Sequence, residues 1–117
     1  MEEELLDDEI LKKAAELREV ILNSEDYKKY LQYKKELEDI PELYEKTNEF
    51  REKNFQLQIT GQSANEELVN QLLMEYGDLL KNIKVSAFMN AELLLCRKLN
   101  TMNHILMKDI DLDLRFL

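Results

Sequence analysis

The stretch VSAFMNAELLLCRKLNTMNHIL, residues 85–106, decides the fold of this chain. Its apolar side chains recur at spacings of three, four and seven residues: Val85, Phe88, Leu95, Leu99, Met102 and Leu106. Residues at these spacings share one side of an α-helix. The stretch therefore predicts a long helix with one apolar face. A carboxylate, Glu92, interrupts that face.

Glu92 is the least expected residue on this helix. A carboxylate buried alone costs several kcal/mol or becomes protonated, so it needs a cation, a cap or water within reach. Arg18 and Arg51 are the candidate cations, because Arg18 follows the apolar stripe of the first helix and Arg51 follows Phe50. An ion pair is one interpretation, a solvated edge position is a second, and a catalytic or metal-binding role is a third. The ion-pair interpretation predicts that Glu92→Ala lowers the free energy of unfolding by about 3 kcal/mol or more.

Composition sets the class of protein. With 117 residues, two Gly, one Pro and no Trp, the chain offers few turns for a strand-rich fold, and we expect a single all-α domain over residues 1–117. A net charge of −9 argues against direct nucleic-acid binding. One Cys, an acidic N-terminus and short apolar runs favour a cytoplasmic protein that does not enter a membrane.

Hydrophobic periodicity predicts five helices in an antiparallel bundle of hairpins. The first four cover residues 7 or 8–22, 25–38, 41–58 and 65–81, and the long fifth helix follows the step at residues 83–84 and runs to residue 107 or 108. A loop at 59–65 carries Gly61 and a possible capping box that begins at Ser63. Gly77 within the fourth helix indicates either the close approach of another helix or mere tolerance. Residues 109–117 alternate acids with apolar residues and are expected to form an extended or frayed tail, or a docking peptide.

Few residues carry possible chemistry. Tyr27, Tyr30 and Tyr33 in the second helix fit packing at the edge of the core, with a ligand-stacking cluster as the alternative. Cys96 and His104 are eight residues apart, about 12 Å along one helix, so they do not form a catalytic pair within one chain. Cys96 is expected to pack at the edge of the apolar stripe. We assign no catalytic residue, cofactor or metal ligand.

Five short segments, in this order and spacing, resemble the YlbF/YmcA family of helical regulators from Gram-positive bacteria. They are SEDYKKY at 24–30, PEL at 41–43, FR at 50–51, NF and LQ within 54–58, and Phe88-x-x-Ala91-Glu92. The resemblance implies a non-enzymatic, oligomerising protein linked to competence, sporulation and biofilm formation. Some members of this family act with YaaT in a complex that influences RNase Y and binds iron–sulfur clusters through cysteines. Because this chain has only Cys96, we assign it no cluster.

We therefore expect a cytoplasmic regulatory or adaptor protein that acts through protein–protein interaction. Self-association is expected because thin or two-sided apolar stripes are hard to bury within one short chain. Its other partners would be regulatory proteins of the YlbF/YmcA/YaaT type. The alternatives are a structural, self-assembling bundle without a regulatory partner and, more distantly, a metal-dependent enzyme that uses Glu92. Besides Glu92 and its candidate arginines, the residues expected to serve structure or interaction are Phe50, Phe88, Ala91, Leu95, Leu99, Tyr27 and Tyr30.

Overall fold

The structure is a computed structural model that describes residues 8–111, and within that range it contains six helices and no strand. The helices are α2 (Glu9–Leu22), α3 (Glu25–Glu38), α4 (Pro41–Ile59), α5 (Glu66–Glu75), α6 (Gly77–Lys81) and α7 (Ile83–Met107). The all-α prediction and the long C-terminal helix are thus confirmed. The expected tail at 109–117 lies outside the described residues from position 112 onward.

Local sequence signals explain where the helices begin. The Asp8 carboxylate accepts hydrogen bonds from the backbone N–H groups of Ile10 and Leu11 at 2.9 and 3.2 Å. Ser24 caps α3 in the same way, and Pro41 occupies the first turn of α4, where no N–H partner is needed. Asn82 caps α7. Short polar side chains therefore set three of these four boundaries.

The predicted helix at residues 65–81 is wrong in one respect, because the chain breaks it into α5 and α6. The backbone leaves helical geometry at Tyr76, which has φ −109° and ψ 19°. A Cβ added to Gly77 would meet no atom within 4 Å, so the close approach of a neighbouring helix is not the reason for this glycine. The cap of α5 is also Asn65 rather than Ser63, since the Asn65 side chain accepts from the Leu68 N–H at 3.2 Å.

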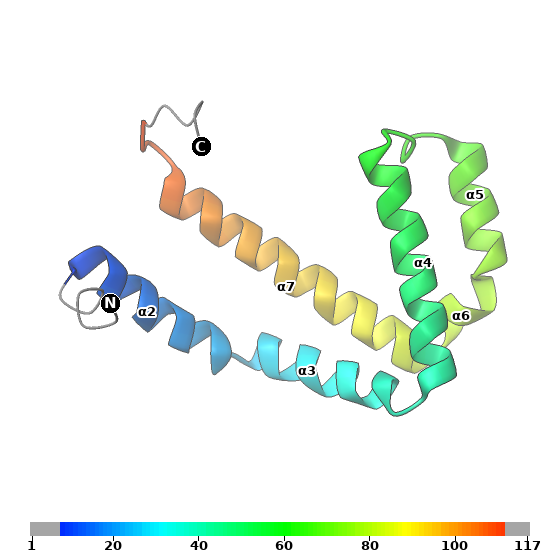
Figure 1. Cartoon of the computed structure of the whole chain (residues 1–117), viewed down its shortest axis with the longest axis horizontal. Coiled ribbons are helices and arrows are strands. Elements are labelled where there is room, and N and C mark those ends of the chain that lie inside the picture. The colour runs from blue at the N-terminus through cyan, green and yellow to red at the C-terminus, as the bar shows by residue number, and fades with distance from the viewer. Residues whose placement is uncertain (1–7, 112–117) are drawn as a thin grey trace.

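The core lies where α3, α4, the C-terminal part of α5 and α6 meet the first half of α7. It is formed by the buried side chains of Leu37, Phe50, Leu72, Tyr76, Leu79, Val85 and Phe88. Thr47 is also fully buried, and its hydroxyl donates to the Leu43 carbonyl at 2.7 Å. α3 runs alongside α7, while α4 and α5 form a hairpin that stands away from it (Figure 1). The apolar spacing of the long helix thus correctly placed Val85 and Phe88 on its buried face.

The second half of the molecule is open. α2 continues from α3 and diverges from the C-terminal half of α7, so that these two helices form the arms of a V (Figure 1). α2 contains no buried residue. The apolar stripe of α7 is buried at Val85, Phe88 and Leu95 but exposed at Leu106. The radius of gyration is 18.6 Å, whereas a compact domain of this length has about 13 Å.

Candidate functional site

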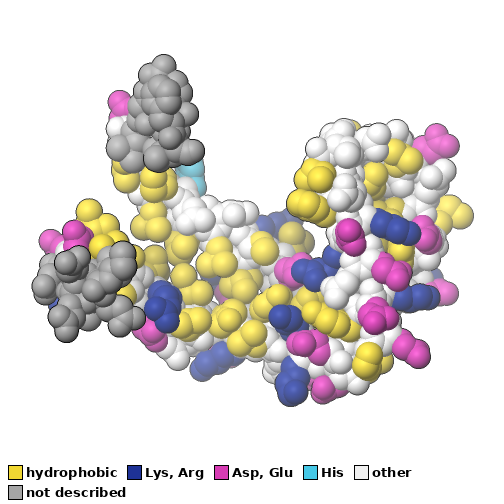
Figure 2. Space-filling model, viewed as in Figure 1, with side chains coloured by type: hydrophobic (Ala, Val, Ile, Leu, Met, Phe, Trp, Pro, Cys, Tyr) yellow, Lys and Arg dark blue, Asp and Glu magenta, His cyan; other side chains and the backbone are white. Residues whose placement is uncertain are grey.

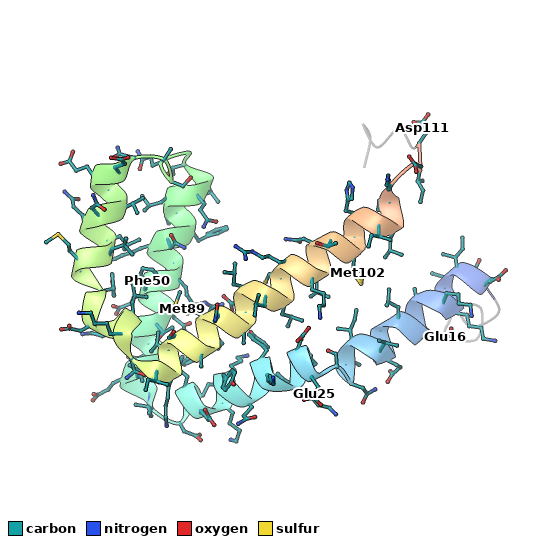
Figure 3. All side chains as sticks on the ribbon, turned by 180° about the vertical axis from the view of Figure 1, so that it is seen from behind. Glu16, Glu25, Phe50, Met89, Met102 and Asp111 are labelled. Carbon is teal, nitrogen blue, oxygen red and sulfur yellow. The ribbon has the colours of Figure 1, made fainter. Side chains whose placement is uncertain are left out.

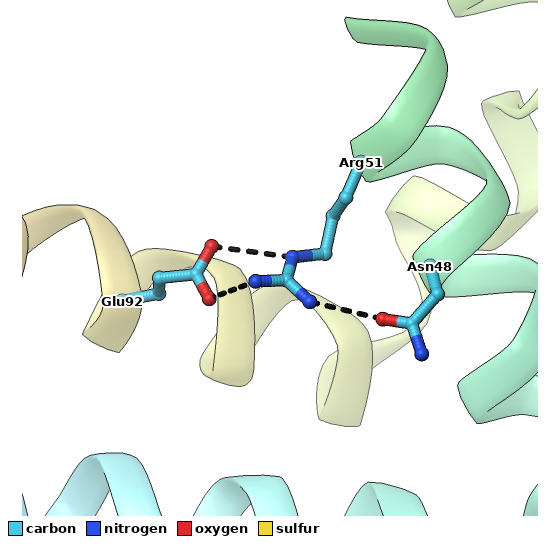
Figure 4. A network of polar contacts seen from close by, with 3 residues as sticks. All are labelled: Asn48, Arg51 and Glu92. Atoms are coloured by element: carbon cyan, nitrogen blue, oxygen red, sulfur yellow. Dashed lines mark hydrogen bonds and ion pairs between the residues drawn. The ribbon is translucent and has the colours of Figure 1, made fainter. Parts of the chain in front are cut away.

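An ion pair joins the hairpin to the long helix. The Arg51 guanidinium on α4 donates from Nε to Glu92 Oε1 at 3.2 Å and from a terminal nitrogen to Glu92 Oε2 (Figure 4). Such a two-pronged contact matches the planar guanidinium to the planar carboxylate. The partner of Glu92 is therefore Arg51 of the same chain. The two side chains keep 34% and 27% of their surface exposed, so the pair lies at the edge of the core.

Two further contacts hold the Arg51 guanidinium in place. Its other terminal nitrogen donates to the Asn48 side-chain oxygen at 2.9 Å, one turn earlier on α4. Its central carbon lies 5.2 Å from the centroid of the Phe88 ring, which is the range of a cation–π contact. Phe88 lies one turn before Glu92 on α7 and is fully buried. The charge is thus fixed by a carboxylate, an amide and an aromatic face.

The aromatic face extends to α3. The Tyr30 ring stacks on Phe88 with centroids 5.7 Å apart, and the Tyr27 ring follows it at 6.4 Å. Burial raises the pKa of the Tyr30 phenol, and the nearby Glu92 carboxylate raises it further, because both disfavour the phenolate. Tyr27 and Tyr30 are half-buried, in keeping with the packing interpretation of these tyrosines.

The remaining predicted residues fall into two groups. Phe50 and Leu95 are buried, and Ala91 and Leu99 are half-buried along α7. Arg18, the other candidate partner of Glu92, instead lines the space between α2 and the far end of α7. The structure therefore brings together Arg51, Glu92 and the aromatic residues, and it leaves Arg18 apart from them.

Beside the ion pair, a cleft of about 870 Å³ opens between α4 and α7. Its walls combine amide and hydroxyl side chains with apolar ones, and they include Asn48, Asn54, Gln58, Ser86, Asn90, Phe55, Leu80, Met89, Leu93 and Cys96. In Figure 3, Phe50 and Met89 mark the region where the hairpin meets α7. Cys96 is exposed on this wall, so the expectation that it packs at the stripe's edge is wrong.

Sequence reasoning did not identify Phe55 or Leu93 as site residues. Both lie off the apolar stripes of their helices, and they are 56% and 46% exposed. An aromatic residue that falls outside a helix's buried stripe was the available signal for Phe55. An apolar centre with a polar rim is typical of surfaces that bind other proteins.

The ion pair has a structural role, because it connects α4 to α7. Each Glu92 oxygen accepts one hydrogen bond from Arg51, so the negative charge of the carboxylate is stabilised by the guanidinium. Within residues 8–111, no group of three or more His, Cys, Asp or Glu residues is placed to hold a metal ion.

The fold and the site define an all-α protein in which an arginine–carboxylate pair ties a helical hairpin to a long helix. Residues 10–111 match the family described as control of competence regulator ComK, YlbF/YmcA. The chain belongs to this family, which is a regulatory one.

Comparison with curated proteins and with solved structures gave no match. Among the described helices, none is both long and apolar enough to cross a bilayer.

Proposed function

We propose that this protein is a non-enzymatic cytoplasmic adaptor that regulates by binding another protein in the cleft between α4 and α7. The observation that carries the proposal is the chain's membership of a family named for the control of a competence regulator. Regulation through a helical protein of this kind requires a surface for a partner. The cleft supplies apolar side chains for contact and amides for hydrogen bonds.

The Arg51–Glu92 pair supports the proposal through its position. It joins α4 to α7, and both of its residues line the cleft, so it helps to fix the distance between the two walls that a partner would contact. A preformed cleft lowers the entropic cost of binding, because the partner does not have to order the walls. In this proposal, Glu92 acts on binding through the shape of the cleft.

We further propose that the chain associates with itself and that its other partners are regulatory proteins of the YaaT type, with RNase Y downstream. Self-association is supported by the many exposed apolar side chains on α2 and α7. The link to YaaT and RNase Y rests on the resemblance to members of the family. The single cysteine fits the reducing cytoplasm in which such partners act.

Affinity capture from the source cell tests the proposal. The bait is the full tagged chain, compared with the Phe55→Glu/Leu93→Glu variant, whose two positions are exposed so that the fold is retained. Met74→Glu is the control, because Met74 is 83% exposed and lies on α5, outside the cleft lining. Far-UV circular dichroism checks that all three proteins are equally helical.

We expect a partner that is recovered by the wild type and the Met74→Glu control and reduced at least tenfold by the cleft variant. Recovery of YaaT-type proteins or of RNase Y would support the finer proposal. Recovery of the chain alone would contradict the adaptor proposal and favour the structural, self-assembling bundle. A partner retained equally by all three baits would show that binding occurs outside the cleft.

A further inference from the structure

The V between α2 and the C-terminal half of α7 is lined mainly by apolar side chains. Its walls enclose about 900 Å³ and include Ile10, Ala14, Leu17, Ile21 and Leu22 from α2, and Met102, Leu106 and Met107 from α7. Figure 2 shows hydrophobic side chains along the facing sides of the two arms, and in Figure 3 Met102 points from α7 towards α2. We call this space the arm groove.

The arm groove leaves apolar surface in water that a compact monomer would bury. Ile10 is 78% exposed, and Leu106 and Met107 are 50% and 51% exposed. The chain presents 9823 Å² to solvent, whereas a compact monomer of 14.0 kDa presents about 6,700 Å². The excess of about 3,000 Å² belongs to the elongated chain as a whole, and the exposed apolar side chains of the arm groove contribute part of it.

The two arms have matching lengths. α2 has 14 residues and so spans about 21 Å, and the part of α7 beyond Leu95 has a similar length. A second V-shaped pair of equal arms can enter the first around a two-fold axis, and the four arms then form a four-helix bundle. Each copy would bury the apolar face of the other with the same residues.

Charge favours a second copy at this face. The chain carries a net charge of −9, so two copies repel each other at most approaches. The residues that line the arm groove include two bases, Lys13 and Arg18, and one acid, Glu9. Because bases outnumber acids in this lining, two acidic chains can meet at the arm groove with few of their carboxylates close to one another.

We propose that the arm groove binds the arm groove of a second copy of this chain, forming an isologous dimer with a shared four-helix bundle of two α2 and two α7 helices. This inference rests on the proposed self-association and names its surface and symmetry. It leaves the cleft between α4 and α7 free in both copies for another protein.

Sedimentation equilibrium of the full chain tests the proposal. The test variant is Ile10→Glu/Leu106→Glu, which places one carboxylate on each arm. The control is Ile83→Glu/Met74→Glu, which changes side chains that are 84% and 83% exposed and lie outside the arm groove. Ile10 and Ile83 both lie in the first turn of a helix, so the new carboxylate meets the same helix dipole in each.

We expect a wild-type dimer whose dissociation constant rises at least about 100-fold in the test variant and less than about threefold in the control. Each substitution occurs twice in an isologous interface, which doubles its effect. A wild type that is monomeric at tens of micromolar would overturn both this inference and the proposed self-association. The arm groove would then belong to another protein or to the terminal residues outside the described range.

A dimer that persists in the test variant would overturn the arm groove alone and leave self-association standing. Cross-linking is an independent check, because it needs no loss of affinity. In a Cys96→Ser background, Met102→Cys, near the middle of the α7 arm where the two-fold axis would pass, should be captured as a covalent dimer by a bismaleimide with a reach of about 10 Å, and Ile83→Cys should not. Equal capture at both positions, or capture at Ile83→Cys only, would count against the proposed arrangement.

Discussion

Removing the Glu92 carboxylate is the sharpest test of how the hairpin is held. Breaking a fully buried ion pair costs 3–5 kcal/mol, whereas exposed pairs contribute about 0.2–1 kcal/mol. Arg51 and Glu92 keep 34% and 27% of their side-chain surface exposed, so water takes over part of the lost interaction. We therefore expect Glu92→Ala to lower the free energy of unfolding by about 2 kcal/mol, less than full burial would imply.

A double-mutant cycle isolates the pair from its surroundings. Arg51→Met removes the charge and keeps methylene groups over the Phe88 ring, where the guanidinium carbon now lies at 5.2 Å. The cycle Glu92→Ala, Arg51→Met and both together should give a coupling energy of about 1–1.5 kcal/mol. Glu92→Gln, which keeps one acceptor oxygen, should lose about half as much stability as Glu92→Ala.

Urea unfolding followed by far-UV circular dichroism measures these energies, with all variants at one protein concentration so that self-association contributes equally. The same cycle on Lys35 and Asp39 is the control, since that pair is 79% and 68% exposed at 3.9 Å and should couple by less than about 0.5 kcal/mol. A coupling energy for Arg51 and Glu92 no larger than that of the control would refute the fastening role of the pair.

Three further predictions concern the core and its turns. Phe88→Ala should cost about 3–5 kcal/mol in urea unfolding, because the ring is fully buried between Tyr30 and Arg51; a loss below about 1 kcal/mol would show that the site collapses around the gap. Gly77→Ala should raise the midpoint of thermal unfolding, since a Cβ there meets nothing and helix propensity improves by about 0.4–1 kcal/mol, whereas Gly61→Ala should lower it because the φ of +73° disfavours a side chain; shifts of the same sign would contradict this contrast. The raised pKa of Tyr30 means that the folded state resists phenolate formation, so its contribution is complete below about pH 10, the ordinary tyrosine pKa, and is lost as the pH rises through the folded-state pKa. Tyr30→Phe should therefore lose less stability than the wild type between pH 9 and 11, and parallel pH profiles in urea unfolding would count against it.

The two proposed surfaces, the arm groove and the cleft between α4 and α7, would bind different partners. In the two proposals, the arm groove joins two copies of the chain and the cleft between α4 and α7 binds a different protein. Their substitutions are separable, because the cleft variant at Phe55 and Leu93 changes no residue of the arm groove. A cleft variant that stays dimeric and an arm-groove variant that still recovers the partner would together show that the two surfaces act independently.

The sequence predicted the helices well wherever a local signal defined their ends. Asp8, Ser24, Pro41 and Asn82 act within one turn of their own positions, so their effect is visible without knowledge of the fold. The break at Tyr76 was missed because the apolar residues of α5 continue at helical spacing through Gly77 into α6. A backbone that leaves helical geometry for a single residue does not alter that spacing enough to be detected.

The sequence by itself also determined that Glu92 needs a partner, because the cost of burying a lone carboxylate follows from its place on an apolar stripe. Only the tertiary structure decided between Arg18 and Arg51, since that choice depends on which helix crosses α7 at Glu92. The same stripe continues on both sides of Glu92 from Val85 to Leu106, yet α3 and α6 cover only its first half. Periodicity shows which side chains form an apolar face. Because α2 and α7 diverge, the tertiary structure decides which of these side chains remain exposed to solvent in the single chain.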